Sequence, residues 1–209
     1  MNRILLKLIL ILVPTSLIVP VYGQEISKDD IIKEVSIAAS KIKSMECSFV
    51  QTKNMKMLGS KVVSKGKMYC TQPDKLRWEY TSPYSYIFIL NSDKVAFKRG
   101  EHKEVIDVNS NRIFKEIASV MLNSVTGNSL TCSNFITEAV AEPKGYAITL
   151  TPLKKEMKML FTKIVLHYNR GISMISEVEL YEKNGDKTVI SLSDVRKNGT
   201  IDDKIYNID

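Results

Sequence analysis

The chain of 209 residues has few of the residue types that carry most enzyme chemistry. It holds two histidines, His102 and His167, and three cysteines, and their spacings match no metal site. It has no Ser/His/Asp set with a nucleophile elbow, no Gly-rich phosphate loop and no paired carboxylates in a recognisable catalytic frame. We therefore expect no enzyme, no catalytic residue, no metal site and no cofactor, and we interpret both histidines as surface residues of strands.

Dense runs of basic residues are missing as well. The formal net charge is +7, from 30 Lys and Arg against 23 Asp and Glu, and the basic residues are spread along the whole chain. Nucleic-acid-binding proteins instead gather Lys and Arg into a patch or stripe. The charged residues are therefore interpreted as solvated strand faces, and no nucleic acid is expected as a partner.

Residues 1–23 have the pattern of a secretory signal peptide. Arg3 and Lys7 give a short positive start, an apolar run covers 4–21, and the segment ends at Gly23. Apart from Lys7, the run falls short of the roughly 20 residues that a membrane-spanning helix needs. No cysteine follows it, which argues against a lipid anchor. We expect cleavage near Gly23, export to the periplasm and one domain over 24–209.

Two amphipathic helices are predicted. The first covers 27–44, where Ser27 can cap the helix and Asp30 follows three residues later. Its apolar stripe at helical spacing is Ile31, Val35, Ala38 and Ile42. The second covers 111–124 and ends before Gly127.

The rest of the chain reads as ten or eleven strands, the last of them a tail strand over 204–208. The connections are too short for crossover helices, so neighbouring strands must pair antiparallel. A sheet of this size has to curl. Two short helices cannot fill its apolar side, so we expect a mainly β fold. Its large antiparallel sheet would form a half-closed barrel over an apolar cavity, with the helices as a partial plug.

One face of this sheet is predicted to be apolar. Leu76, Trp78 and Tyr80 alternate with charged residues, which is the period of a half-buried strand. Nine methionines add adaptable apolar surface. The residues expected on the inner face are Phe49, Met55, Met57, Met68, Leu76, Trp78, Ile87, Ile89 and Phe97 from strands, and Ile117, Val120 and Met121 from the second helix. The alternative is that they form a dry core without a cavity.

The turn of the first predicted hairpin determines whether two of the cysteines lie opposite each other. A two-residue turn at 58–59 places Cys47 directly opposite Cys70, within the separation that a disulfide spans. The pair is therefore a disulfide candidate for an exported protein. The alternative is two small apolar residues in the wall of the sheet. Cys132 is expected to be a buried free thiol.

Several motifs resemble the LolA family of periplasmic outer-membrane lipoprotein carriers. The similarity covers essentially the whole of 24–209, and the Phe-x-Gln and Pro-x-x-x-x-Trp elements carry most of it. The matching segments are Ser48-Phe49-Val50-Gln51, Gly66-Lys67-Met68, 73–80 with Pro83, Leu150-Thr151-Pro152, 161–168, 175–189 and the ending 193–208.

The resemblance implies an incomplete antiparallel barrel with a helical lid over an apolar cavity. Such carriers take acylated lipoproteins from an inner-membrane ATP-driven exporter, an ABC transporter, and bring them across the periplasm to the outer membrane and its receptor. The acyl chains would then lie against the inner-face residues, and the helix from Asn111 would be part of the lid. Leu76 occupies a position associated with handover from the exporter. We expect a monomer.

One residue departs from the family pattern. Well-studied members have an arginine immediately before the first conserved proline, where it bonds lid backbone and holds the empty form closed. Gln72 occupies that place here. Its amide can still donate to lid carbonyls, but without charge assistance such bonds are roughly twofold weaker. Arg77 on the same strand is the alternative latch.

Two rival functions remain open. A LolA-like carrier could shuttle a glycolipid or another lipid-linked metabolite in place of a lipoprotein. A periplasmic sensor module could use a similar half-barrel to bind a regulatory partner.

Overall fold

The computed structural model describes residues 26–107, 130, 134–169 and 174–208. The segment 1–23, the helix expected over 111–124 and Cys132 lie outside the described residues. No helix within the described part of the chain is both long and apolar enough to cross a membrane.

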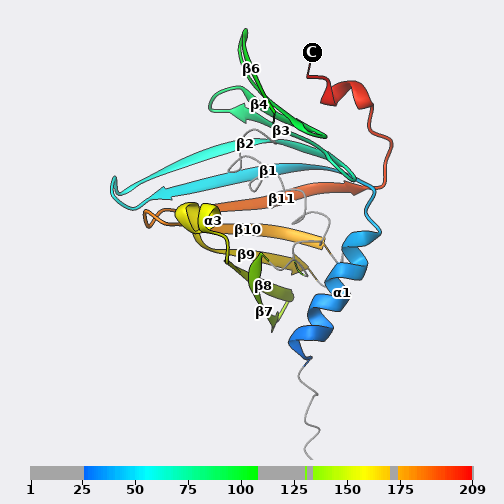
Figure 1. The fold of residues 1–209 in the computed structure, drawn as a ribbon, viewed down its shortest axis with the longest axis vertical. Helices are drawn as coiled ribbons and strands as arrows, with labels where there is room; N and C mark the ends of the chain where they lie inside the picture. Colours follow the sequence, from blue (N-terminus) through cyan, green and yellow to red (C-terminus); the bar gives the residue numbers. More distant parts are fainter. Residues whose placement is uncertain (1–25, 108–129, 131–133, 170–173, 209) are drawn as a thin grey trace, which may run out of the picture.

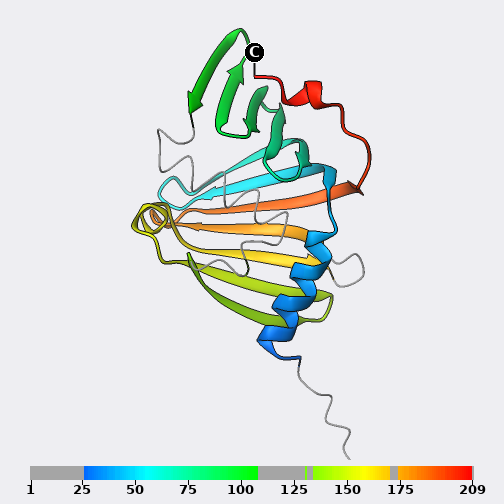
Figure 2. The same ribbon diagram turned by 45° about the vertical axis from the view of Figure 1, so that its right-hand side comes forward.

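The fold is one open antiparallel sheet of eleven strands (Figures 1 and 2). Its order is β6-β5-β4-β3-β2-β1-β11-β10-β9-β8-β7, so β6 and β7 form opposite edges and the barrel is incomplete, as predicted. The strands are β1 Ser44–Met55, β2 Ser60–Thr71, β3 Lys75–Ser82, β4 Tyr86–Asn91, β5 Lys94–Arg99, β6 His102–Asp107, β7 Phe135–Glu142, β8 Gly145–Pro152, β9 Phe161–Asn169, β10 Met174–Glu182 and β11 Lys187–Lys197.

Helix α1 (Lys28–Ser40) begins where the sequence predicts. The Ser27 side chain accepts a hydrogen bond from the backbone N–H of Asp30 at 3.2 Å, which satisfies one of the unpaired donors of the first turn. Ile31 and Val35 are buried against β7–β10, and the third buried residue of the helix is Ala39, not Ala38. In Figure 1 the helix runs beside the ends of these strands.

Two short elements differ from the predictions. Residues Lys155–Leu160 form helix α3, which the sequence did not indicate. The tail forms the 3-10 helix η3 (Asp203–Tyr206) instead of an edge strand. The Asp202 side chain accepts from the N–H of Lys204 at 2.9 Å and so starts this turn. Tyr206 is then buried against Ile89 and Ala96, so the tail packs on a face of the sheet and does not extend its edge.

The two faces follow from the strand register. One face, which we call the inner face, carries Phe49 of β1 and the residues aligned with it, and α1 packs on this face. The opposite face, the outer face, carries Arg77 of β3 and the tail helix η3. Figure 2 shows α1 and the red C-terminal segment against different parts of the sheet.

The first hairpin has a longer turn than predicted. Met55 pairs with Ser60, so Cys47 lies opposite Met68 and Cys70 lies opposite Met45. The predicted direct Cys47–Cys70 pair is wrong by a shift of two residues, which keeps both thiols on the inner face. Both are buried and free, and burial raises the pKa of each thiol to about 12. These thiols stay protonated at neutral pH, so the structure supports the alternative of two apolar wall residues.

Gly66 marks a close approach of backbone to an aromatic ring. It pairs with Phe49, whose side chain is almost completely buried. A Cβ at Gly66 would overlap the carbonyl oxygen of Glu79 and lie 2.6 Å from Cζ of the Phe49 ring. Glycine therefore lets the Phe49 ring and the β3 backbone approach β2 closely.

We predict that Gly66→Ala lowers the free energy of unfolding by about 3 kcal/mol, because strands and ring must move apart to admit the methyl group. Chemical denaturation followed by circular dichroism measures this change. Gly199→Ala is the matched control, since nothing lies within 4 Å of a Cβ there, and it should change stability by less than about 0.5 kcal/mol. Equal effects of the two substitutions would contradict the packing of Phe49 on Gly66.

Candidate functional site

The inner face holds two buried apolar clusters that meet in the middle of the sheet. One is built on β1–β5 around Phe49, Met68, Leu76 and Trp78, and the other on α1 and β7–β10. Val178, Leu180 and Leu192 are half-buried and pack against both. A continuous apolar surface therefore crosses the sheet from β5 to β8.

An arc of aromatic rings covers the β3–β5 end of the inner face. Ring centroids lie 4.5 Å apart for Phe49 and Trp78, 5.2 Å for Phe49 and Tyr80, and 6.0 Å for Tyr80 and Tyr86. Phe97 continues the arc at 6.1 Å from Tyr86 and 5.5 Å from Phe88. Tyr80, Tyr86, Phe88 and Phe97 are only half-buried, so this part of the face is apolar and still accessible.

Tyr80 brings a polar hydroxyl into this arc. It donates to Oε1 of Gln51 at 2.9 Å, and burial raises the pKa of the phenol above its ordinary value. The hydroxyl is therefore neutral and paired with an amide, which avoids a charge on the apolar surface.

Five of the residues predicted for the inner face lie in its buried or aromatic parts. These are Phe49, Met68, Leu76, Trp78 and Phe97. Met55 is half-buried at the last pair of β1 and shares the register of Phe49. Met57 is 90% exposed in the hairpin turn, so its prediction is wrong: the turn covers 56–59 and β1 ends before it. The predicted residues Ile117, Val120 and Met121 lie outside the described residues.

Ile87 and Ile89 were assigned to the wrong face. Both belong to the outer-face cluster around Tyr206, and Phe88 between them faces inward. Residues 86–90 are apolar throughout, so their own pattern does not indicate which face each side chain takes. The pairing with β3 determines which side chains of β4 face inward. Tyr80 pairs with Tyr86 and Trp78 with Phe88 across a short turn, so Tyr86 and Phe88 share the inner face with them. Counting the residues between the two strands would have placed Tyr86 and Phe88 on the inner face from the sequence alone.

A polar network ends the inner face at the β1–β2 hairpin. Lys53 Nζ lies 2.8 Å from Oε2 of Glu182 and 3.6 Å from Oδ2 of Asp186. The Thr188 hydroxyl donates to Glu182 at 3.0 Å, and Asp186 accepts from the N–H of Lys56 at 2.9 Å. The apolar surface is therefore bounded by charged groups that are already paired.

Gln72 bonds the corner where α1 passes into β1. Its side-chain amide donates to the carbonyl oxygen of Ile42, and its backbone N–H donates to the carbonyl of Lys43 at 2.9 Å. Asn198, just after β11, holds the same corner from the other side. Its side chain accepts from the N–H of Lys43 at 2.7 Å and donates to the carbonyl of Lys41 at 3.1 Å. Gln72 therefore meets α1's end, while the helix expected as its partner is not described.

Arg77 lies on the outer face and is not in place to act on the inner one. Its guanidinium donates to Oε2 of Glu79 at 2.8 and 3.0 Å and to the carbonyl of Ile205 at 3.1 Å. It also lines an outer pocket with Ile87, Ile89, Ala96, Lys98, Lys103 and Asn207. The suggestion that Arg77 replaces the family's latch is therefore wrong, because the alternation of β3 points it away from the apolar surface.

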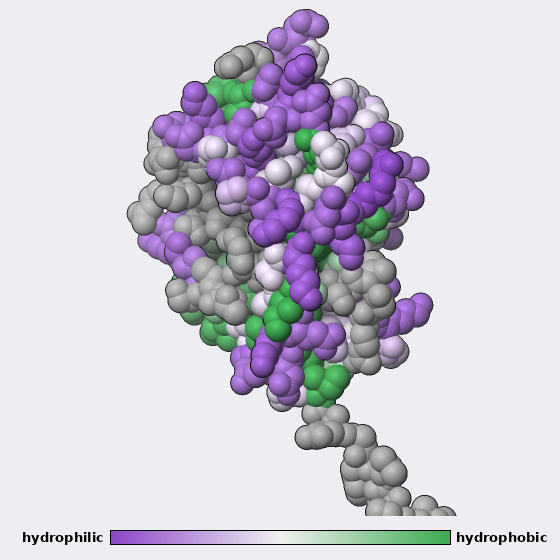
Figure 3. All heavy atoms as spheres, turned by 90° about the vertical axis from the view of Figure 1, so that its right-hand side faces the viewer, coloured by the Kyte–Doolittle hydropathy of each residue, from purple (hydrophilic) through white to green (hydrophobic). Residues whose placement is uncertain are grey.

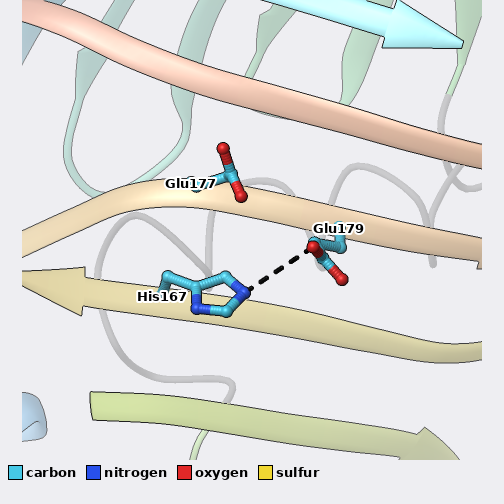
Figure 4. A group of neighbouring side chains, drawn as sticks. All are labelled: His167, Glu177 and Glu179. Atoms are coloured by element: carbon cyan, nitrogen blue, oxygen red, sulfur yellow. Dashed lines mark ion pairs between the residues drawn. The ribbon is translucent and has the colours of Figure 1, made fainter. Parts of the chain in front are cut away.

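A further group of polar side chains lies on the outer face at β9 and β10. Figure 4 shows His167 of β9 beside Glu177 and Glu179 of β10, with Nε2 of the imidazole 3.9 Å from Oε1 of Glu179. One potential ligand atom from each residue lies within 4.8 Å of the other two. Sequence spacing did not reveal this group, because its members come from two strands that become neighbours only in the sheet.

The outside of the molecule is mainly hydrophilic on the side of α1. In Figure 3 hydrophobic residues appear there only as small patches, mostly in the lower half of the view. The exposed large apolar residues of the described chain include Ile26 and Ile37 at the helix.

Comparisons with known proteins agree with this architecture. An outer-membrane lipoprotein carrier protein of Methylococcus capsulatus is 24% identical over 165 residues, covering 78% of this chain and 76% of the relative. One of Chromohalobacter salexigens is 26% identical over 140 residues, covering 66% of this chain and 63% of the relative. The MucA/MucB complex of Pseudomonas aeruginosa shares the fold, with a TM-score of 0.51 at 12% identity over 86% of this chain and 60% of that one.

The family model described as "Outer membrane lipoprotein carrier protein LolA" matches residues 40–209. This range takes in β1–β11, the aromatic arc and the corner at Gln72. The chain belongs to the LolA family of outer-membrane lipoprotein carrier proteins.

Proposed function

We propose that this protein binds the acyl chains of lipoproteins on its inner face and carries them through the periplasm to the outer membrane. The half-buried aromatic arc beside Val178, Leu180 and Leu192 supports this proposal most strongly. Such a surface on an open sheet can take up a long apolar ligand without first unpacking a closed core. Family membership supports the lipoprotein as cargo and the periplasm as location.

The free-energy cost of exposing an acyl chain to water makes an apolar binding surface necessary. Each methylene removed from water contributes about 0.8 kcal/mol, so a dozen methylenes contribute about 10 kcal/mol. A free acyl chain would therefore stay in its membrane. A protein surface that covers as much apolar area as the acyl chain exposes offsets that cost during transfer. No covalent step is needed. The donor would be an inner-membrane ABC transporter and the acceptor an outer-membrane receptor.

Gln72 would control access to the inner face. Its bond to the Ile42 carbonyl ties the β2–β3 corner to the end of α1, and α1 covers the β7–β10 half of the face. An amide–carbonyl bond contributes only about 1 kcal/mol, so a partner could break it at low cost. An arginine, as in the family pattern, would hold the corner more tightly through charge-assisted bonds.

A second candidate keeps the fold and changes the partner. The MucB structure is described in complex with MucA, and it shares the fold of this chain. A periplasmic sensor with this fold would use the inner face to detect acylated ligand and another surface to bind a regulator. A carrier of glycolipids or other lipid-linked metabolites would also use the same face.

We predict that Phe88→Ser weakens binding of a synthetic diacylated lipopeptide roughly thirtyfold, because truncating the ring removes about 2 kcal/mol of apolar contact. Titration followed by tryptophan fluorescence of Trp78 measures the affinity. Val105→Ser is the matched control: Val105 pairs with Ala96 on the outer face and is 48% exposed. Equal losses for both variants, or none for either, would refute binding on the inner face.

We predict opposite effects of two substitutions at Gln72 on the rate of lipopeptide uptake. Gln72→Ala removes the bond to Ile42 and should speed uptake severalfold, whereas Gln72→Arg should slow it. Stopped-flow fluorescence measures both rates. Asn91→Ala is the control, since its side chain also bonds a backbone carbonyl, that of Tyr206, but on the tail side of the sheet. Unchanged rates in both Gln72 variants would remove this residue from the latch.

A further inference from the structure

The cluster of His167, Glu177 and Glu179 lies on the face opposite the apolar surface. His167 and Glu177 are directly paired across β9 and β10, and Glu179 is the next residue of β10 on that face. All three side chains are partly buried. The cluster is therefore separate from the surface proposed to bind acyl chains.

The hydrogen bond at Nδ1 determines the tautomer of His167. Nδ1 lies 3.2 Å from Oε2 of Glu142, and a carboxylate can only accept, so Nδ1 carries the proton. In the neutral form of the ring, Nε2 then has a bare lone pair that a metal ion can accept. This atom is buried and has no hydrogen-bond partner among the described residues. It lies 3.9 Å from Oε1 of Glu179.

The distance from Nε2 to Glu179 suits a metal ion better than a proton. At 3.9 Å the two atoms are too far apart for a hydrogen bond. Zinc–nitrogen and zinc–oxygen bonds are each about 2.0–2.1 Å long, so two tetrahedral ligand atoms lie about 3.3–3.4 Å apart, and Nε2 and Oε1 need to approach each other by only about 0.5 Å. Glu177 completes the set by a rotation of its flexible side chain.

The charges around the cluster also favour a divalent cation. Both oxygens of Glu179 accept hydrogen bonds in this structure, Oε2 from the Tyr181 hydroxyl at 2.7 Å and Oε1 from Lys187 Nζ at 2.9 Å. Three carboxyl groups, those of Glu142, Glu177 and Glu179, surround the imidazole. The nearby ammonium groups are that of Lys187 at Glu179 and that of Lys163 over the Tyr181 ring, so acidic groups outnumber basic ones.

We propose that His167, Glu177 and Glu179 bind a divalent transition-metal ion, with Zn²⁺ as the preferred ion. One imidazole nitrogen and two carboxylate oxygens match the ligands that zinc takes, whereas Mg²⁺ and Ca²⁺ prefer oxygen alone. Glu142 orients the imidazole from behind, as carboxylates do for metal-binding histidines. Three protein ligands leave a fourth position for water. The ion would join β9 to β10 on the outer face.

Isothermal titration with ZnCl₂ tests this site on the full mature chain without a histidine tag, with Cys132→Ser to remove a competing thiol. We expect one ion per molecule. His167→Ala should abolish saturable binding, and Glu179→Gln should weaken it at least tenfold. Glu142→Gln should weaken it roughly tenfold to a hundredfold through loss of ring orientation.

Two further variants separate the site from general effects. The chain has only one other histidine, and His102→Ala should leave zinc affinity unchanged. Lys187→Gln removes the cation that competes for Oε1 of Glu179 and should strengthen zinc binding severalfold. The proposal is overturned if the unaltered chain shows no saturable binding, or if His167→Ala binds zinc as the unaltered chain does.

Discussion

The pairing of β1 with β11 is the contact on which the open sheet depends. In the described sheet order it joins the early strands β2–β6 to the late strands β7–β10. It also places Phe49 opposite Leu192, where the two apolar clusters of the inner face meet. The corner at Ile42 and Lys43 secures this pairing, because Gln72 and Asn198 bond it from the two sides of β1.

An open sheet with one apolar face is a compromise between stability and access. A closed core would bury every ring of the aromatic arc. A wholly exposed apolar face would promote aggregation. Here Phe49 and Trp78 are buried, and Tyr86, Phe88 and Phe97 remain half-buried beside them. The gradient from core to accessible surface lets the same residues stabilise the fold and contact a ligand.

Much of this architecture could be predicted because β3 alternates clearly and the connections are short. The failures have physical causes. Ile87 and Ile89 were misplaced because the tail covers the outer face of β4, which makes that strand apolar on both sides. The cysteine register failed through two extra turn residues. The cluster of His167, Glu177 and Glu179 was not predicted, because its members become neighbours only through the β9–β10 pairing.

If the inner face carries the acyl chains of lipoproteins, the protein isolated from its own periplasm should contain such cargo, and native mass spectrometry would detect it. We expect a complex with the mass of an intact acylated lipoprotein, lost when the acyl chains are removed enzymatically. A protein that carries only a small lipid, or binds its partner equally well after deacylation, would contradict this expectation.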